Sequence, residues 1–232
     1  MSIFAIADLH LSFGDKIDKP MDVFGPNWEN HAERVKEEWE KTVTSDDTVI
    51  IAGDISWALK EQDAMADLDW IHALPGEKVL IKGNHELWWM STNRLNKLYE
   101  KGMYFVQNNF HAVGETAICG SRGWICPGTE GFSQHDEKIY ARELLRLKMS
   151  LDAAQNAGYT DIIGVLHYPP TNESHQPSGF TELFEKYKVR QVVYGHLHGK
   201  DIWPRGLQAV FNGVDYRLVS LDKMKAKLLK LR

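Results

Sequence analysis

Carboxylate, amide and imidazole side chains recur along this chain, and each group of them follows directly after a short apolar run. The members of the set are Asp8, His10, Asp54, Asn84, His85, His167, His196 and His198. Oxygen and nitrogen donors without a thiolate suit manganese, iron or zinc, and also nickel or cobalt. The residue types therefore predict a metal centre.

Taken singly, each motif is weak evidence for such a centre. An Asp-x-His or Gly-Asp pair at a strand end is usually a turn, and Gly-Asn is ordinary turn chemistry as well. A lone histidine before Tyr-Pro-Pro, such as His167, is more often a loop histidine. The prediction comes from their conjunction, since every motif lies at the end of a predicted strand. Glycines at 53, 83 and 195 let the backbone turn sharply and approach ions closely.

Five short apolar runs precede these motifs and predict the strands that position them. They are 3–7, 49–52, 79–81, 162–166 and 192–194. Runs this short, rich in Ile and Val and without clean alternation, are typical of strands buried on both faces. In open α/β sheets, sites gather at the carboxyl ends of the strands. We therefore expect the donor residues to meet at one edge of the structure.

Helical spacing of apolar residues separates these strands. Helices are predicted over 28–43, 59–74, 87–99, 137–156 and 181–188. From Leu207 onward the chain reads as strands, with a turn at Asn212-Gly213. The Lys-rich stretch from Lys223 to Lys230 reads as a solvated strand face. With no linker, repeat or low-complexity segment, the sequence predicts one α/β domain over 1–232.

In order and in approximate separation, these motifs resemble those of the calcineurin-like metallophosphoesterases. The resemblance rests on Asp8-x-His10, Gly53-Asp54, Gly83-Asn84-His85-Glu86, His167 and Gly195-His196-x-His198, and it spans positions 3 to about 200. It implies a four-layer α/β/β/α sandwich of two mixed sheets. It also implies that Asp8, His10 and His198 hold one ion, and that Asn84, His167 and His196 hold the other. Asp54 would bridge the two ions, and His85 would be a catalytic group rather than a ligand.

Two metal ions in such a centre lower the pKa of a shared water and clamp the attacking and leaving oxygens. The resulting prediction is a hydrolase of a small phosphomonoester or phosphodiester, with a metal-bridging hydroxide as the nucleophile and His85 as the general acid. A neutral amide ligand such as Asn84 adds no negative charge where a phosphate must approach. Arg122, between two glycines, is a candidate for gripping a phosphate oxygen, although a surface arginine on a strand connection is the alternative.

One run departs from the pattern of the protein Ser/Thr phosphatases in that family. After Gly-Asp these enzymes have an Asp that orients the catalytic histidine and an Arg that grips phosphate. Here Trp57 and Ala58 occupy the two positions. The departure argues against a protein phosphatase and leaves His85 without an identified partner.

Composition limits the partners that we expect. The net charge of −5 and the lack of a basic stripe argue against an extended nucleic acid as the partner. Two cysteines, Cys119 and Cys126, are too few for a disulfide framework, and no signal peptide or membrane span is expected. We expect a cytoplasmic protein. A non-catalytic binding or scaffold module and a nuclease remain alternatives, and the oligomeric state stays open.

Overall fold

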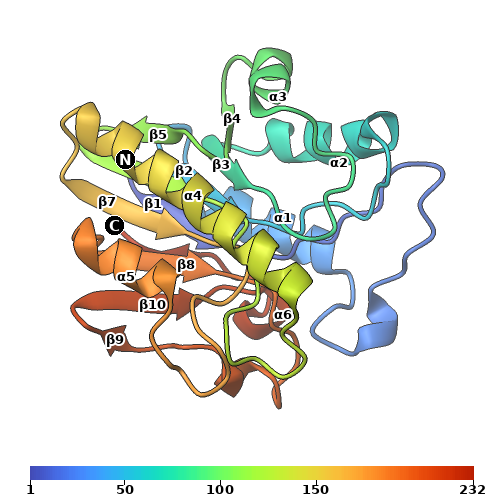
Figure 1. The fold of residues 1–232 in the computed structure, drawn as a ribbon. Helices are drawn as coiled ribbons and strands as arrows, with labels where there is room; N and C mark the ends of the chain where they lie inside the picture. Colours follow the sequence, from blue (N-terminus) through green and yellow to red (C-terminus); the bar gives the residue numbers. More distant parts are fainter.

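Two β-sheets stack face to face in this chain (Figure 1), as the computed structural model of residues 1–232 shows. The first sheet has the order β11-β1-β2-β3-β4. Its strands are β1 (Ile3–Ile6), β2 (Thr48–Ala52), β3 (Glu77–Ile81), β4 (Met103–Val106) and β11 (Leu229–Lys230). All its neighbours are parallel except β11, which runs antiparallel to β1.

The second sheet has the order β5-β6-β7-β8-β10-β9. Its strands are β5 (Phe110–Val113), β6 (Thr116–Gly120), β7 (Asp161–Val165), β8 (Gln191–Tyr194), β9 (Val210–Phe211) and β10 (Val214–Leu218). The two edge strands β5 and β9 are antiparallel to their neighbours, and the inner pairs are parallel. The expectation of two mixed sheets is therefore confirmed.

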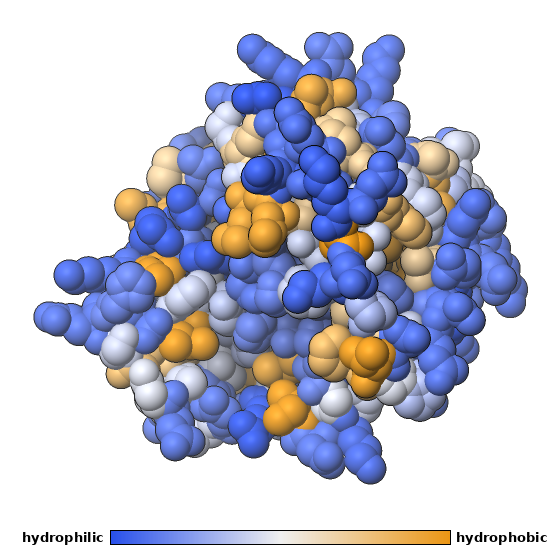
Figure 2. Space-filling view, turned by 90° about the vertical axis from the view of Figure 1, so that its right-hand side faces the viewer, coloured by the Kyte–Doolittle hydropathy of each residue, from blue (hydrophilic) through white to orange (hydrophobic).

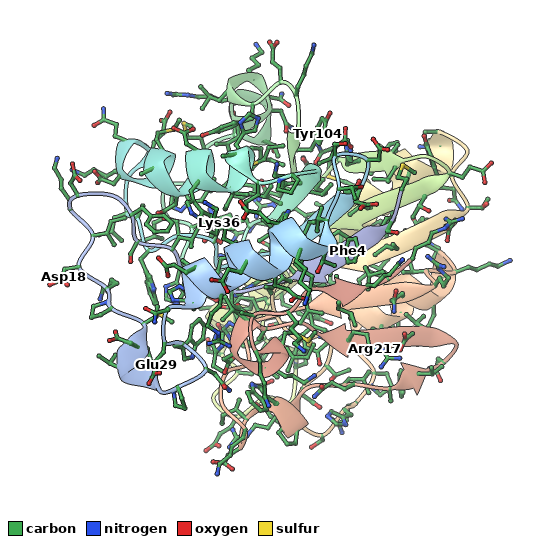
Figure 3. All side chains as sticks on the ribbon, turned by 180° about the vertical axis from the view of Figure 1, so that it is seen from behind. Phe4, Asp18, Glu29, Lys36, Tyr104 and Arg217 are labelled. Atoms are coloured by element: carbon green, nitrogen blue, oxygen red, sulfur yellow. The ribbon has the colours of Figure 1, made fainter.

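Helices cover the outer face of each sheet. The first sheet is covered by α1 (His31–Thr42), α2 (Glu61–Ala73) and α3 (Thr92–Leu98), of which α1 and α2 lie in front in the rear view (Figure 3). The second sheet is covered by α4 (Gln134–Asn156) and α5 (Gly179–Lys186). A short helix α6 (Leu221–Met224) and the 3-10 turns η1 (Asp22–Phe24) and η2 (Trp203–Arg205) complete the elements.

Three apolar cores hold these layers together, and β1 shows how one strand serves two of them. Phe4 and Ile6 point to the helices of the first sheet, whereas Ile3 and Ala5 point into the core between the sheets. Side chains alternate between the faces of a strand, so a strand buried on both faces must be apolar throughout. The predicted four-layer α/β/β/α sandwich is confirmed on this pattern.

One predicted helix begins later than expected. The segment from Leu87 is not helical, and α3 starts only at Thr92, where the side chain of Ser91 accepts the backbone N–H of Arg94. The preceding residues are kept out of a helix because Glu86 turns inward and its carboxylate accepts backbone N–H groups of the β2 loop.

The carboxyl-terminal stretch also differs from its prediction. Lys223 lies in α6 rather than on a strand, and only Leu229 and Lys230 pair with β1. The strands β4, β5 and β6 were not predicted, although β4 and β5 close one edge of each sheet. The turn at Asn212-Gly213 is confirmed, because both residues have the positive φ that a tight hairpin between β9 and β10 requires.

The two cysteines are free and buried, as expected. None of the helices combines the length and the apolar character that a membrane span demands.

A candidate metal centre at the strand ends

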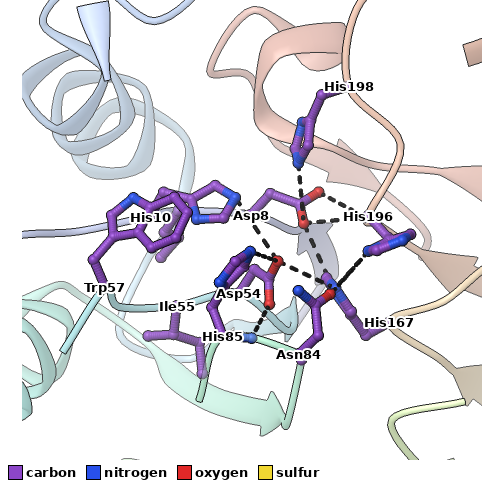
Figure 4. A network of polar contacts seen from close by, with 12 residues as sticks. Asp8, His10, Asp54, Ile55, Trp57, Asn84, His85, His167, His196 and His198 are labelled. Atoms are coloured by element: carbon purple, nitrogen blue, oxygen red, sulfur yellow. Dashed lines mark hydrogen bonds and ion pairs between the residues drawn. The ribbon is translucent and has the colours of Figure 1, made fainter. Parts of the chain in front are cut away.

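The carboxyl ends of five strands meet at one end of the sandwich, on the right in Figure 1. Three of them belong to the first sheet (β1, β2, β3) and two to the second (β7, β8). Their parallel registers align the last residues of neighbouring strands, as in the pairs Ile6–Ile51 and Ala52–Ile81. The donor residues that follow these strands are therefore brought together, as Figure 4 shows.

The first group of donors consists of Asp8, His10 and His198, with one ligand atom of each within 4.8 Å of the others. Asp8 and His10 follow β1, whereas His198 follows β8 of the other sheet. The Nε2 atom of His198 lies 3.8 Å from a carboxylate oxygen of Asp8. The backbone N–H of His196 donates to the same carboxylate at 3.1 Å, which holds the two sheet ends together.

The second group consists of Asp54, His167 and His196, again within 4.8 Å of one another. The amide oxygen of Asn84 belongs with them, since it lies 2.8 Å from His167 Nε2 and 2.9 Å from His196 Nδ1. Those two ring nitrogens are 3.3 Å apart. Three donor atoms from three different strand ends therefore converge on one point.

Asp54 lies between the two groups. Its Oδ2 atom is 3.3 Å from His167 Nε2 of the second group and 3.8 Å from His10 Nε2 of the first. A carboxylate in that position is able to contact both ions of a pair. The division of donors agrees with the division that the family resemblance implies.

The backbone at these residues is unusual. Four of the candidate ligands have positive φ, namely Asp8 (63°), His10 (46°), Asp54 (50°) and His196 (74°). Side-chain-bearing residues rarely adopt this conformation, which costs about 1–3 kcal/mol each and is found most often at functional sites. Four such residues around one point indicate that the backbone adopts an unfavourable conformation here, at a cost in stability, and that this conformation directs the side chains toward the site.

Glycine allows the loops to approach each other. At Gly53, where φ is 87°, an added Cβ would lie 2.6 Å from His167 Nδ1. At Gly83 an added Cβ would overlap the carboxylate of Asp54. Both positions therefore exclude any side chain, in agreement with the role predicted for them.

The protonation states suit metal ligation. Burial lowers the pKa of His10, and burial together with His167 lowers the pKa of His196 to about 3, so both imidazoles keep a free lone pair. Burial would favour neutral Asp54, but His167 and His10 outweigh it and hold the pKa of Asp54 well below its usual range. Burial likewise opposes a charged His167, yet Asp54 raises the pKa of His167 to about 9. In the metal-free site the proton on His167 balances the negative charge of Asp54, and a bound cation would displace that proton.

Buried polar atoms without partners test whether metal ions fit here. His10 Nδ1 and His198 Nε2 are both buried and have no hydrogen-bond partner. In His198, the Nε2 atom points to Asp8, and the Nδ1 atom donates to Asp222 Oδ1 at 3.1 Å. His167 Nδ1 donates in the same way to the carbonyl oxygen of Ala52 at 3.0 Å, so that Nε2 is the ring atom that faces Asn84 and Asp54. Metal-binding histidines are typically oriented by such a second hydrogen bond, so the residues fit metal ions.

Asp222 is a further candidate site residue that was not predicted from the sequence. It lies in α6, is buried, and accepts hydrogen bonds from the His198 ring and the Gly199 backbone. The only signal in the sequence is an acidic residue shortly after an apolar strand, which is the same pattern that identified Asp8.

Substitution Asp222→Asn should weaken metal binding by about 10- to 100-fold, because the amide no longer offers the negative charge that orients His198 and makes it more basic. Titration of the metal-free protein with Mn²⁺ measures this change. Asp201→Asn, at an exposed aspartate nearby, is the matched control. Equal affinities of the Asp222 variant and the control would show that Asp222 does not support a ligand.

Glu86 belonged to a quoted motif but had no role assigned from the sequence. Its carboxylate is fully buried and accepts the backbone N–H groups of Gly83, Asp54 and Ile55. Glu86 therefore joins the β2 and β3 loops, which carry Asp54 and Asn84.

His85 lies beside the centre with its side chain 38% exposed. Its Nε2 atom is 3.8 Å from Asp54 Oδ2, and no closer polar partner holds the ring. Instead the ring packs on Trp57 at 4.2 Å between centroids, and Trp57 also stacks on His10 at 4.7 Å. Trp57 stands where the protein phosphatases have the orienting aspartate, and its ring contacts the ring of His85.

Arg122 is not brought to this centre. Its guanidinium pairs with the fully buried Glu143 at 3.4 Å and lies 4.5 Å from the ring of Trp124. It does not line the cavity over the donor groups. The buried carboxylate of Glu143 attracts the charge of Arg122 together with that of Arg146, which lies 2.7 Å away.

A cavity of about 410 Å³ opens over the donor groups. The long segment between β1 and α1 forms part of its wall, through Met21 and Phe24, next to Trp28 and Trp57. Trp88 and Trp89, by contrast, fill the core of the first sheet. The face that holds the cavity is hollowed and hydrophilic at its centre, with apolar patches around it (Figure 2).

Comparison with known proteins assigns this arrangement to a family. Residues 1–200 match the model of the calcineurin-like phosphoesterases. The chain is 33% identical over 204 residues to the Gene 66 protein of Mycobacterium phage D29, covering 87% of this chain and 80% of that protein. It is 26% identical over 222 residues to the Gene 66 protein of Mycobacterium phage L5, covering 94% and 89%.

Solved structures share the fold. The phosphopantetheinyl hydrolase from Mycobacterium tuberculosis aligns with a TM-score of 0.58 at 16% identity, covering 99% of this chain and 95% of that one. The protein TT1561 of Thermus thermophilus aligns with a TM-score of 0.61 at 12% identity, covering 98% and 96%. At such identities the likeness shows the fold alone.

Proposed function

This chain belongs to the calcineurin-like phosphoesterase family, and on that premise we propose that it hydrolyses small phosphate esters with two metal ions. Asp8, His10 and His198 would hold one ion, and Asn84, His167 and His196 the other, with Asp54 shared. When bound, the ions supply an activated water and neutralise charge on the phosphoryl oxygens. Manganese, iron and zinc are the metals proposed, with nickel or cobalt as further candidates.

The residues of the chain would perform the remaining tasks. His85, beside Asp54 and open to the cavity, would donate a proton to the leaving oxygen. Trp57 would hold the ring of His85 by direct packing. Asn84 would contribute an oxygen ligand without charge, which leaves the approach to the centre favourable for an anionic substrate.

The observation that carries this proposal is the meeting of Asn84 Oδ1, His167 Nε2 and His196 Nδ1 within 3.3 Å of one another, beside the shared Asp54. A binding or scaffold module without catalysis would not need eight such side chains and four positive-φ residues at one point. The two free, buried cysteines agree with a reducing compartment, and we propose the cytoplasm.

Removal of metal should abolish turnover. With Mn²⁺ present we expect hydrolysis of 4-nitrophenyl phosphate or bis(4-nitrophenyl) phosphate, a fall to the uncatalysed background after thorough chelation, and recovery when Mn²⁺ is restored. Chelator saturated with Mn²⁺ beforehand is the control for effects of the chelator itself. Activity that persists in the metal-free protein would exclude the two-metal mechanism.

A further inference from the structure

Two cavities of different chemistry meet at His85. The first, of about 410 Å³, lies over the candidate metal centre, and the second, of about 530 Å³, lies beside it. Both are lined by Trp57, Asn84 and His85. A substrate phosphorus bound at the centre would therefore have space for a substituent on either side of these three residues.

The cavity over the centre has an apolar wall. Met21, Phe24 and Trp28 line it from the segment between β1 and α1, and Trp57 lines it from the loop after β2. The side chain of Phe24 is exposed, at 67% of its full surface. An exposed aromatic residue facing a functional cavity is typical of a surface that contacts a flat or apolar ligand.

The second cavity combines apolar and charged side chains, with Ile17, Leu59 and Leu87 beside its charged residues. Lys16, Lys19 and Lys60 line it together with Asp18 and Asp63, so its lining has one excess positive charge. Lys19 Nζ lies 5.7 Å from the ring centre of Trp57, which places this cation next to the ring that packs on His85. None of the ion pairs in the structure involves the three lysines, whose ammonium groups are free to meet an anion.

His85 limits where the leaving group of a substrate can lie. In hydrolysis, the oxygen of water forms a bond to phosphorus while the bond from phosphorus to the leaving oxygen breaks. The leaving oxygen then takes the proton that His85 holds, and water restores that proton, so that one water is consumed per ester. The leaving group must lie within reach of His85, which lines both cavities, and of the two only the second presents lysine side chains.

We infer, on the basis of the proposed function, that the substrate is a phosphodiester with its retained group on the apolar wall and a negatively charged leaving group in the lysine-lined cavity. A monoester would fill only one of the two cavities. A neutral leaving group would leave the excess positive charge of the second cavity without a partner.

Four chromogenic esters test this inference. They are phenyl 4-nitrophenyl phosphate, phenyl 3-carboxy-4-nitrophenyl phosphate and the two corresponding monoesters without the phenyl group. The carboxylate adds charge to the leaving group at a position too far from phosphorus to assist the reaction itself. We expect kcat/KM to be at least about 10-fold higher for the diesters than for the monoesters, and about 5- to 10-fold higher for the carboxylated diester than for the uncarboxylated one.

The triple variant Lys16→Gln/Lys19→Gln/Lys60→Gln should lose the carboxylate preference. The matched control Lys41→Gln/Lys138→Gln/Lys227→Gln removes the same charge from exposed lysines outside both cavities and should retain it. A wild-type preference for monoesters or for the uncarboxylated diester would overturn the inference, as would equal loss in both triple variants. In each of these cases metal-dependent turnover would persist, whereas failure of the proposed function would remove turnover of all four esters.

Discussion

Replacement Asp54→Asn should remove bound metal and reduce kcat/KM for nitrophenyl phosphate by at least about 10³-fold. Asp54 Oδ2 lies 3.3 Å from His167 Nε2 and 3.8 Å from His10 Nε2, so its charge serves both groups of donors. The amide keeps the shape of the side chain and still accepts the backbone N–H of His85, which the carboxylate accepts at 3.0 Å. The loss would therefore reflect the missing charge rather than a collapsed loop.

Metal analysis after loading with Mn²⁺ and desalting gives the primary result for this variant. Asp46→Asn, at an exposed aspartate after α1, is the control for the loss of one carboxylate. Circular dichroism confirms that both variants fold. An Asp54 variant with the metal content of the wild type would rule out the shared position of Asp54.

Replacement His85→Ala should also reduce turnover, but the variant should retain both metals. His85 lies 3.8 Å from Asp54 but belongs to neither group of donors. If His85 protonates the leaving oxygen, its loss matters most for a strongly basic leaving group. We expect kcat to fall by about 10²- to 10⁴-fold for phenyl phosphate, and much less for 4-nitrophenyl phosphate, whose phenolate needs little help from an acid.

The comparison of the two substrates separates an acid from a residue with a structural role. A structural defect would slow both substrates by the same factor, whereas a missing acid slows phenyl phosphate selectively. His135→Ala, in an exposed position at the start of α4, is the control. Loss of both metal ions from the His85 variant would contradict the division between ligands and acid.

The candidate metal donors could be predicted from sequence because local patterns determine where each strand ends. The run Ile3–Ile6 is apolar because it is buried on both faces, and its end is marked by the first residues that must leave the sheet, Asp8 and His10. The same reasoning applies to Asp54 after β2 and to His167 after β7. These strands are parallel to their neighbours, so their ends lie at one edge whatever the lengths of the connections.

Elements with weaker local signals were not predicted. β5, for example, is half-buried and mixes Phe110, His111 and Ala112, so neither an apolar run nor a clean alternation marks it. The helix expected from Leu87 failed for a different reason, since the preference of residues 87–91 for a helix was overridden by Glu86, whose carboxylate satisfies backbone N–H groups on another loop.

The sequence by itself determined the fold family and the candidate donors at the strand ends, because a strand end is a local event that its own residues specify. Only the tertiary structure decided what surrounds the centre. It brought Asp222 against His198 from 24 positions away, turned Arg122 toward Glu143, and placed Trp57 on the ring of His85. These contacts join segments that share no strand or helix, and their geometry depends on how two sheets and their loops pack in three dimensions. The candidate metal centre was expected as two groups of ligands that share Asp54. The structure adds the residues that orient these ligands and two adjoining cavities.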